Sequence, residues 1–304
     1  MKIVTCRCTV KAQTMAIFNL GSINIDLVYR VSHFPAAGET LTTSSFMRAL
    51  GGKGANQSIA LAAAGAKICH IGAASPADEW LFNEMAHCGV DMTFVQESPA
   101  PTGHAIVSVN DEGENQILLY PGANRAIDMK QALAALSEAG SADWVLLQNE
   151  TNGAPEFVEA AKARGLKIAY SAAPFEEHVA MRLLPDCDLL IVNEGEAAAL
   201  ASASGKKPQE LGLAHLVITR GGAGADYFGV DGRFHQPAFA VEPVDTTGAG
   251  DCFFGYFLAG IAVGEGVEAT LRVASAAAAL QVTKAGAATS IPSRADVIAF
   301  IEDC

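Results

Sequence analysis

Short hydrophobic runs alternate with longer amphipathic segments along most of this chain. The runs are rich in Val, Ile and Leu and are too short for helices, so we expect buried strands at 17–20, 68–71, 144–147, 166–170, 189–192 and 216–219. The amphipathic segments between them predict helices at 53–64, 79–88, 130–138, 155–164 and 194–201. Strands and helices that alternate at this spacing predict an α/β fold with a mostly parallel sheet flanked by helices.

Two segments break this alternation, at about 27–50 and 102–120, and both have the pattern of antiparallel strands. The second contains a hairpin, because strands at 105–109 and 116–120 flank a polar turn at 110–114. We expect the two segments to form a small separate sheet, which would serve as a lid over one end of the parallel sheet. Beyond them the chain is predicted to end in helices at 251–263, 267–284 and 294–301.

Composition narrows the class of protein. Half of the 304 residues are hydrophobic and 17% are charged, which predicts a sizeable buried core. The net charge of −13 comes without a basic stripe, so we expect no nucleic-acid partner. No hydrophobic run has the length of a membrane span, so we expect no membrane partner either. We interpret residues 1–14 as a disordered or non-native extension and 15–304 as one domain, because the first strand follows directly after Met15 and no linker marks a second domain.

The cysteines, the histidines and the absence of one serine motif disfavour several other classes of protein. The seven cysteines are an odd number and include no C-x-x-C pair, so we expect reduced thiols in a cytoplasmic protein. The histidines are scattered singly, without the spacing of a zinc site. No G-x-S-x-G motif supports a serine hydrolase.

The most informative segment is Asp245-Thr246-Thr247-Gly248-Ala249-Gly250-Asp251, followed by the hydrophobic run 252–258. It predicts a small-residue turn that opens a helix, and the free N–H groups and positive dipole end of a helix N-terminus attract phosphate. A carboxylate at that place would repel phosphate, so Asp251 calls for a chemical role. We expect it to remove a proton from a hydroxyl that attacks phosphorus. The alternative is that Asp251 is only a helix-start residue.

A second glycine-rich segment is Gly51-Gly52-Lys53-Gly54-Ala55-Asn56-Gln57. A P-loop would need Gly at position 47 and Ser or Thr at position 54, where this chain has Met and Gly. We expect the backbone to approach a small polar ligand here, with Lys53 and Asn56 as donors. Asn24 and Asp26 alternate after the first strand and would complete a set that binds sugar hydroxyls. The alternatives are a helix entry with Lys53 in solvent, and a simple turn at 24–26.

Two further segments follow predicted strands, where open α/β sheets bind ligands. Asn193 and Glu196 begin a helix, and Glu196 could orient Mg²⁺-bound water or complete a capping box with Asn193. The glycine-rich segment 221–225 precedes a hairpin rather than a helix, so a dinucleotide-binding motif is disfavoured. A loop beside adenine or a triphosphate fits this segment better.

With these residues in place, the chain resembles the ribokinase-like (phosphofructokinase-B type) family of sugar kinases, and its ribokinase members most. The two family signatures match 51–57 and 245–251, and further matching segments are 21–26, 35–40, 110–115, 122–124 and 193–196. The resemblance covers about residues 15–300. It implies a central, mostly parallel sheet flanked by helices, with a small β-sheet lid that also pairs two subunits as a homodimer.

The resemblance also implies transfer of the ATP γ-phosphate to a primary hydroxyl of a sugar, in the nearest case ribose to ribose 5-phosphate. Asp251 would be the base, with an anion hole made by the N–H groups of Gly248, Ala249 and Gly250. The sugar would be bound by Asn24, Asp26, Gly52, Lys53, Asn56, Glu150 and Asp251. ATP, with Mg²⁺, would be bound by Asn193, Glu196, Thr219, Gly221, Gly222 and Gly224. A monovalent cation, K⁺, would be bound by the Asp245 carboxylate, the carbonyls of Thr247, Gln281, Lys284 and Gly286, and the Ser290 hydroxyl.

The chain departs from the family pattern at 73–78, 148–151 and 171–174, where the last of these lacks an asparagine near the phosphate path. These departures bear on which sugar is bound more than on the type of reaction. A kinase for another sugar, a sugar acid or a nucleoside is therefore an alternative. A sugar or nucleotide sensor without activity is a further alternative, although a sensor has no use for the base Asp251.

Overall fold

A computed structural model describes residues 15–304, and the predicted extension at 1–14 lies outside the described residues. Within them, the main sheet has the strand order β13-β12-β11-β10-β9-β8-β1-β4-β5. Its strands are β1 (Ala16–Leu20), β4 (Lys67–Ala74), β5 (Asp91–Glu97), β8 (Trp144–Leu147), β9 (Lys167–Ser171), β10 (Leu189–Asn193), β11 (His215–Thr219), β12 (Ala225–Gly229) and β13 (Gly232–Gln236). All neighbours pair in parallel except β11-β12 and β12-β13, which form the antiparallel edge.

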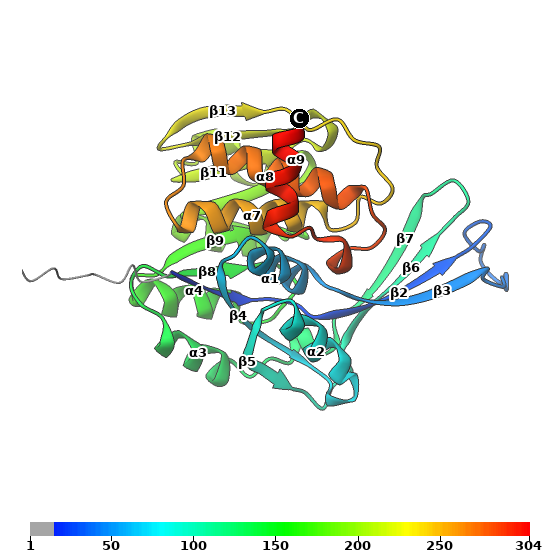
Figure 1. Cartoon of the computed structure of the whole chain (residues 1–304). Helices are drawn as coiled ribbons and strands as arrows, with labels where there is room; N and C mark the ends of the chain where they lie inside the picture. Colours follow the sequence, from blue (N-terminus) through cyan, green and yellow to red (C-terminus); the bar gives the residue numbers. More distant parts are fainter. Residues whose placement is uncertain (1–14) are drawn as a thin grey trace, which may run out of the picture.

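Helices cover both faces of this sheet, which explains why its central strands are hydrophobic throughout (Figure 1). Every residue of β1 and β8 is buried. One core cluster contains residues of α1 (Lys53–Ala63), α2 (Glu79–His87), α7 (Ala249–Ala262), α8 (Val267–Val282) and α9 (Arg294–Asp303). The other contains residues of α3 (Met129–Ala135), α4 (Ala154–Ala163), α5 (Glu177–Leu183) and α6 (Glu194–Ser204). Within residues 15–304, every helix is too short or too polar to cross a lipid bilayer.

A small second sheet extends from one end of the molecule (Figure 1). Its strands are β2 (Asn24–Arg30), β3 (Ser45–Gly51), β6 (Gly103–Val109) and β7 (Asn115–Tyr120), in the order β3-β2-β6-β7. The two predicted segments do meet in one sheet, and each forms an antiparallel pair. The central pair β2-β6 is parallel, so the sheet is mixed. Its root, at Asn24 and Gly51, is buried, whereas most of β7 is exposed.

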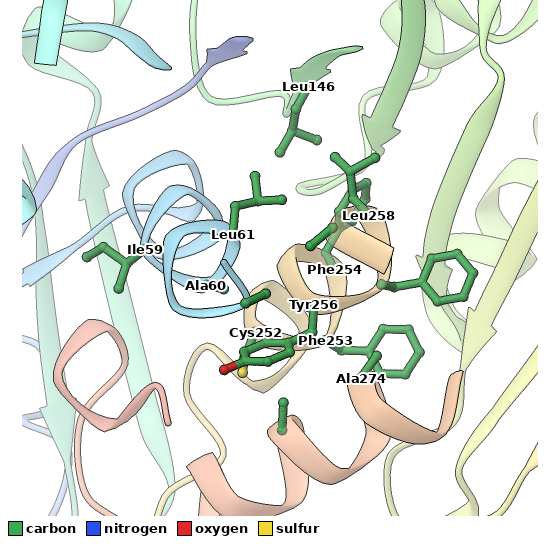
Figure 2. Packing of buried hydrophobic residues seen from close by; sticks show 14 of the residues in the cluster. Ile59, Ala60, Leu61, Leu146, Cys252, Phe253, Phe254, Tyr256, Leu258 and Ala274 are labelled. Carbon is green, nitrogen blue, oxygen red and sulfur yellow. The ribbon is translucent and has the colours of Figure 1, made fainter. Parts of the chain in front are cut away.

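Helices α1 and α7 pack with their backbones close together. A Cβ atom added at Gly255 of α7 would lie 2.4 Å from the Ala60 Cβ of α1 and 2.9 Å from the Leu61 nitrogen. Figure 2 shows Ala60 and Leu61 beside α7, with Ala274 of α8 on another side of the same helix. Each of these two helices follows one of the glycine-rich signatures, so this contact brings two segments almost 200 residues apart into one place.

Candidate active site

The predicted site residues gather at the carboxyl ends of the central strands. The chain leaves β1 toward β4 and β5 on one side, and returns to β8 and its neighbours on the other. The crevice between β1 and β8 is therefore a topological switch point, where open α/β sheets bind ligands. The helix N-termini of α1 and α7 and the root of the small sheet all lie at this crevice.

The turn before α7 has the geometry of an anion site. Gly248 has a φ of 78°, a conformation that favours glycine, and the first regular helical bond runs from the Cys252 N–H to the Gly248 carbonyl at 2.9 Å. Within residues 15–304, the N–H groups of Gly250 and Asp251 have no acceptor. The Ala249 N–H makes a long bond of 3.3 Å to the Thr246 carbonyl. The free N–H groups therefore point into the site at the positive end of a 14-residue helix.

The Asp251 carboxylate is 8% exposed and is bound on both oxygens by α1. Asn56 donates its side-chain N–H to Asp251 Oδ2 at 3.0 Å, and Gln57 donates to Oδ1 at 2.9 Å. Asn56 was predicted in a sugar-binding role, and the structure places it against Asp251. Gln57 was not predicted in any role, because adjacent positions on a helix ordinarily face different directions.

An acidic cluster with one lysine surrounds Asp251. Burial, together with the charges of Glu150 and Asp251, raises the pKa of Asp26 to about 6. Burial also raises the pKa of Glu150. The carboxylate of Asp251, with those of Glu150 and Glu196, raises the pKa of Lys53. Lys53 is therefore held as a cation among carboxylates, which is the charge balance expected of groups that bind a neutral polyhydroxyl ligand.

Glu150 also fixes the entry of α1. Its Oε2 accepts the Lys53 backbone N–H at 3.1 Å and a hydrogen bond from the Ser22 hydroxyl. A carboxylate at a helix N-terminus is stabilised by the helix dipole. Gly52 precedes the helix with a φ of 92°, and a Cβ atom there would lie 3.0 Å from the Asn24 nitrogen. Asn24 itself is buried and accepts a hydrogen bond from the Asn124 side chain at 2.7 Å, so Asn24 lies beside Gly52 at the start of α1.

A cavity of about 660 Å³ is lined by Ala249 and Gly250, directly before Asp251, and is large enough for a nucleotide. Five of the six predicted nucleotide residues line it, namely Asn193, Thr219, Gly221, Gly222 and Gly224, together with Gly250 of the α7 turn. The opposite wall is largely apolar and was not predicted, because it combines a loop at 238–243 with small residues of α8, among them Ala278 and Ala279. An apolar wall beside a polar one suits a base and its phosphates.

Glu196, the sixth predicted residue, forms a capping box with Asn193. The Glu196 N–H donates to Asn193 Oδ1 at 2.8 Å, and the Asn193 N–H donates to Glu196 Oε2 at 2.9 Å. Burial raises the pKa of the Glu196 carboxyl. The predicted capping box of this pair is therefore confirmed. The second carboxylate oxygen of Glu196 takes no part in it.

The predicted cation residues form one connected cluster behind the α7 turn. The Asp245 carboxylate accepts from the Thr247 N–H and the Gly286 N–H, each at 2.9 Å. Burial opposes ionisation of Asp245, but these hydrogen bonds outweigh it and lower its pKa. Gln281 donates to the Thr247 carbonyl at 3.3 Å, Ser290 donates to the Gly286 carbonyl, and the Lys284 N–H donates to the Gln281 carbonyl.

One atom of this cluster has no partner. The side-chain Oε1 of Gln281 is buried and accepts no hydrogen bond from any described residue. A buried acceptor without a donor costs free energy. Carboxylate, carbonyl and hydroxyl oxygens around such an acceptor are the donor set of a hard monovalent cation, so the residues present fit K⁺.

Comparison with known proteins agrees with this geometry. Residues 16–294 match the model of the pfkB family carbohydrate kinases. The chain belongs to this family. As a pfkB carbohydrate kinase it is a phosphotransferase with an alcohol group as acceptor.

Relatives of this pfkB kinase act on several sugars by name. It is 33% identical over 299 residues to a ribokinase of Haemophilus influenzae, across 93% of this chain and 97% of that protein. It is 31% identical over 295 residues to a deoxyribokinase of Salmonella typhi, across 92% and 96%. Among solved structures, Arabidopsis thaliana ribokinase complexed with ribose and ATP has a TM-score of 0.80 and 28% identity, across 95% of this chain and 99% of that one.

Proposed function

We propose that this kinase transfers the γ-phosphate of ATP to a primary hydroxyl of D-ribose and forms D-ribose 5-phosphate. The observation that carries the proposal is the position of Asp251 at a helix N-terminus with free N–H groups, beside Asp26 and Lys53 and directly after Gly250, which lines the 660 Å³ cavity. The likeness to a ribokinase of Haemophilus influenzae and to a ribokinase that binds ribose and ATP supports it.

In the proposed reaction, the Asp251 carboxylate accepts the proton of the attacking sugar hydroxyl. The sugar oxygen forms a bond to the γ-phosphorus while the bond from that phosphorus to the β–γ bridging oxygen breaks, and ADP leaves. The N–H groups of Gly248, Gly250 and Asp251 lie at the positive end of α7 and stabilise charge on the transferring group. Ala249 joins them once its long bond to Thr246 opens.

Sugar hydroxyls would bind to the cluster at the root of the small sheet. The carboxylates of Asp26 and Glu150 would accept hydrogen bonds from sugar hydroxyls, while Lys53 and the amides of Asn24 and Asn56 would donate hydrogen bonds to hydroxyl oxygens. The Gly52 backbone lies close enough to this cluster to contact the ligand. The small sheet would close over the sugar as a lid, which excludes water and prevents wasteful hydrolysis of ATP.

Two metal ions belong to the proposal. Mg²⁺ would accompany the ATP phosphates, with its waters oriented by Glu196, and would neutralise phosphate charge. K⁺ would be held by Asp245, the carbonyls of Thr247, Gln281, Lys284 and Gly286, and Ser290. Its charge would offset the Asp245 carboxylate and hold the loop that carries the anion hole.

We also propose a homodimer through the small sheet. Seven large hydrophobic side chains of its strands are exposed, namely Phe46, Met47, Ile106, Ile117, Leu118, Leu119 and Tyr120. Contiguous exposed hydrophobic side chains of this kind mark protein interfaces. The lid would then be braced by the second subunit.

Release of ADP, measured over a panel of acceptors, tests the proposed substrate. The panel contains ribose, 2-deoxyribose, fructose, keto-deoxy sugar acids and nucleosides, each with and without K⁺. We expect kcat/KM for ribose to exceed that of every other acceptor by at least about tenfold. The deoxyribokinase relative makes 2-deoxyribose the second candidate. A higher kcat/KM for another acceptor overturns the assignment of ribose, and no turnover with any acceptor points to a sensor.

A further inference from the structure

A chain of buried polar side chains runs away from Asp251 into the space between α1 and the main sheet. Gln57 donates to Asp251 Oδ1 at 2.9 Å, and Gln148 donates its Nε2 to Gln57 Oε1 at 2.7 Å. Gln148 Nε2 also donates to Asn19 Oδ1 at 3.0 Å. Asn19 Nδ2 in turn donates to the Ser58 hydroxyl at 2.9 Å. Gln57, Gln148, Asn19 and Ser58 are each at most 1% exposed, although none of them was predicted in a functional role.

The direction of every bond in this chain follows from the carboxylate at its end. An amide must present its N–H to a carboxylate, so the carbonyl oxygen of Gln57 faces Gln148. That oxygen requires a donor, which fixes the amide of Gln148, and the same argument fixes Asn19. Asn19 then has its amino group free to donate to the Gly54 carbonyl at 2.9 Å and to Ser58. No amide in the chain can turn over without placing two acceptors or two donors face to face, although the Oε1 of Gln148 has no partner among residues 15–304.

His70 lies at the far end of this chain of hydrogen bonds, and its hydrogen bonds are consistent with the same donor-to-acceptor direction. The Ser58 oxygen accepts from Asn19, so the Ser58 hydroxyl donates to His70 Nδ1, at 2.8 Å. His70 Nε2 therefore carries the proton and donates to the Gly21 carbonyl at 3.1 Å. Complete burial lowers the pKa of His70 to about 4, so the imidazole is neutral at physiological pH, as this tautomer requires.

We propose that Gln57 is a positioning residue for the phosphoryl transfer, which fixes the Asp251 carboxylate in one orientation because Gln148 and Asn19 fix Gln57. This inference rests on the proposed role of Asp251 as the base. Asn56 binds the other carboxylate oxygen, but its buried Oδ1 has no partner among residues 15–304, whereas the Oε1 of Gln57 accepts from Gln148. Gln57 is thus the donor whose carbonyl oxygen is also held.

The chemical effect of Gln57 is twofold. A hydrogen bond donated to a carboxylate stabilises its charged form, which is the form that accepts a proton. It also turns one lone pair of the carboxylate toward the sugar, and misplacement of a reacting group by about 1 Å can cost about a hundredfold in rate. Substitution of Gln57 should therefore change the pH profile and kcat, and leave sugar affinity almost unchanged.

The variant Gln57→Met keeps the length of the side chain and removes its amide. We expect kcat to fall by about tenfold or more, since a charge-assisted bond is lost, and the acidic limb of the kcat/KM profile to move up by about one pH unit. Sugar affinity measured by calorimetry should change by less than about twofold. The charged groups that face Asp251 are Asp26 from β2, Lys53 from α1, Glu150 after β8 and Glu196 from α6, and they are present in every variant compared.

Two further variants separate positioning from loss of stability. Gln148→Met leaves Gln57 in place but removes the donor that holds the amide of Gln57. We therefore expect a smaller fall in kcat and a smaller shift of the acidic limb than in Gln57→Met. Leu61→Ala, on a buried part of α1 that packs against α7, should lower the melting temperature and leave the pH profile unchanged.

The outcomes are distinct. The inference is overturned if Gln57→Met and Gln148→Met both keep the original kcat and the original acidic limb of the pH profile. It is also overturned if Gln57→Met loses no more activity than Leu61→Ala when the two variants have the same melting temperature. If Gln57→Met does not fold, Gln148→Met alone decides by the same readouts. Near-normal activity of Asp251→Asn would show instead that the proposed base is wrong, whatever Gln57 does.

Discussion

Replacement of Asp251 by asparagine is the most direct perturbation of the proposed mechanism. The two side chains have the same shape, so the packing around α7 is retained. The asparagine has one carbonyl oxygen and no basic oxygen, and it cannot accept a proton from the sugar hydroxyl. Its amino group would also face one of the two donors, Asn56 or Gln57, that now bind the carboxylate oxygens.

These contacts set the expected magnitudes. Loss of a general base reduces the rate by about 10²–10⁴, which corresponds to about 3–5 kcal/mol of transition-state stabilisation. One buried donor left without an acceptor costs about 1–3 kcal/mol of stability. Removal of the Asp251 charge relieves its repulsion with Asp26 and Glu150, and it also removes its attraction to Lys53, so the two changes in charge interaction oppose each other. We therefore expect a large loss of activity with a small change in melting temperature.

The assay follows ADP release at saturating ATP and sugar, with sugar affinity measured separately by calorimetry. We expect kcat to fall by at least about a hundredfold while the dissociation constant for the sugar changes by only a few fold. A kcat within about tenfold of the original protein would refute the reasoning, because positioning alone would then account for the reaction. A parallel fall in affinity and stability would show that the substitution had damaged the site as a whole.

Three further predictions concern groups around this site. The pKa of Asp26, raised from 3.8 to about 6, means that the folded protein binds this proton more tightly, so stability falls as pH rises from about 4 to about 6. Asp26→Asn should therefore raise the free energy of unfolding by up to about 3 kcal/mol at pH 7.5, but not below pH 4, and it should weaken sugar binding. An equal rise in the free energy of unfolding, measured with urea, at both pH values would contradict this. Gly255→Ala should destabilise by about 1–3 kcal/mol, because its Cβ would lie 2.4 Å from that of Ala60, and Ala60→Gly added to it should recover part of the loss of melting temperature. Asp245→Asn should weaken the response to K⁺ without abolishing turnover. The response is measured as the increase in ADP release, and as the rise of melting temperature, when K⁺ replaces tetramethylammonium. An unchanged response would argue against a cation at Asp245.

Much of the main sheet could be predicted because its strands are buried on both faces. Such strands are continuous hydrophobic runs, as in 144–147, and all six predicted runs are strands of this sheet. Strand β5 was missed because it lies at the sheet edge, where the pattern of Asp91–Glu97 is mixed rather than hydrophobic. Helix α5, of seven residues, was not predicted.

The glycine-rich signatures located the site, and their chemistry suggested which groups gather there. Sequence spacing could not show that α1 and α7 meet, because their close approach depends on Gly255 and Ala60, which lie outside both signatures. The same limit hid Gln57, whose importance depends on the position of Gln148 at the end of a different strand. The apolar wall of the nucleotide cavity was also hidden, since alanines on α8 carry no chemical signal of their own.

The contact between α1 and α7 has a consequence for synthesis of the protein. Helix α1 is complete at Ala63, whereas α7 ends at Ala262, so about 200 further residues must be made before the two can pack. At about 5–20 residues per second this takes about 10–40 s, during which the side of α1 that packs against α7 is uncovered. The nascent chain therefore acquires its site only after α7 has been made, and a bound sugar or nucleotide can stabilise the chain from then on but not before.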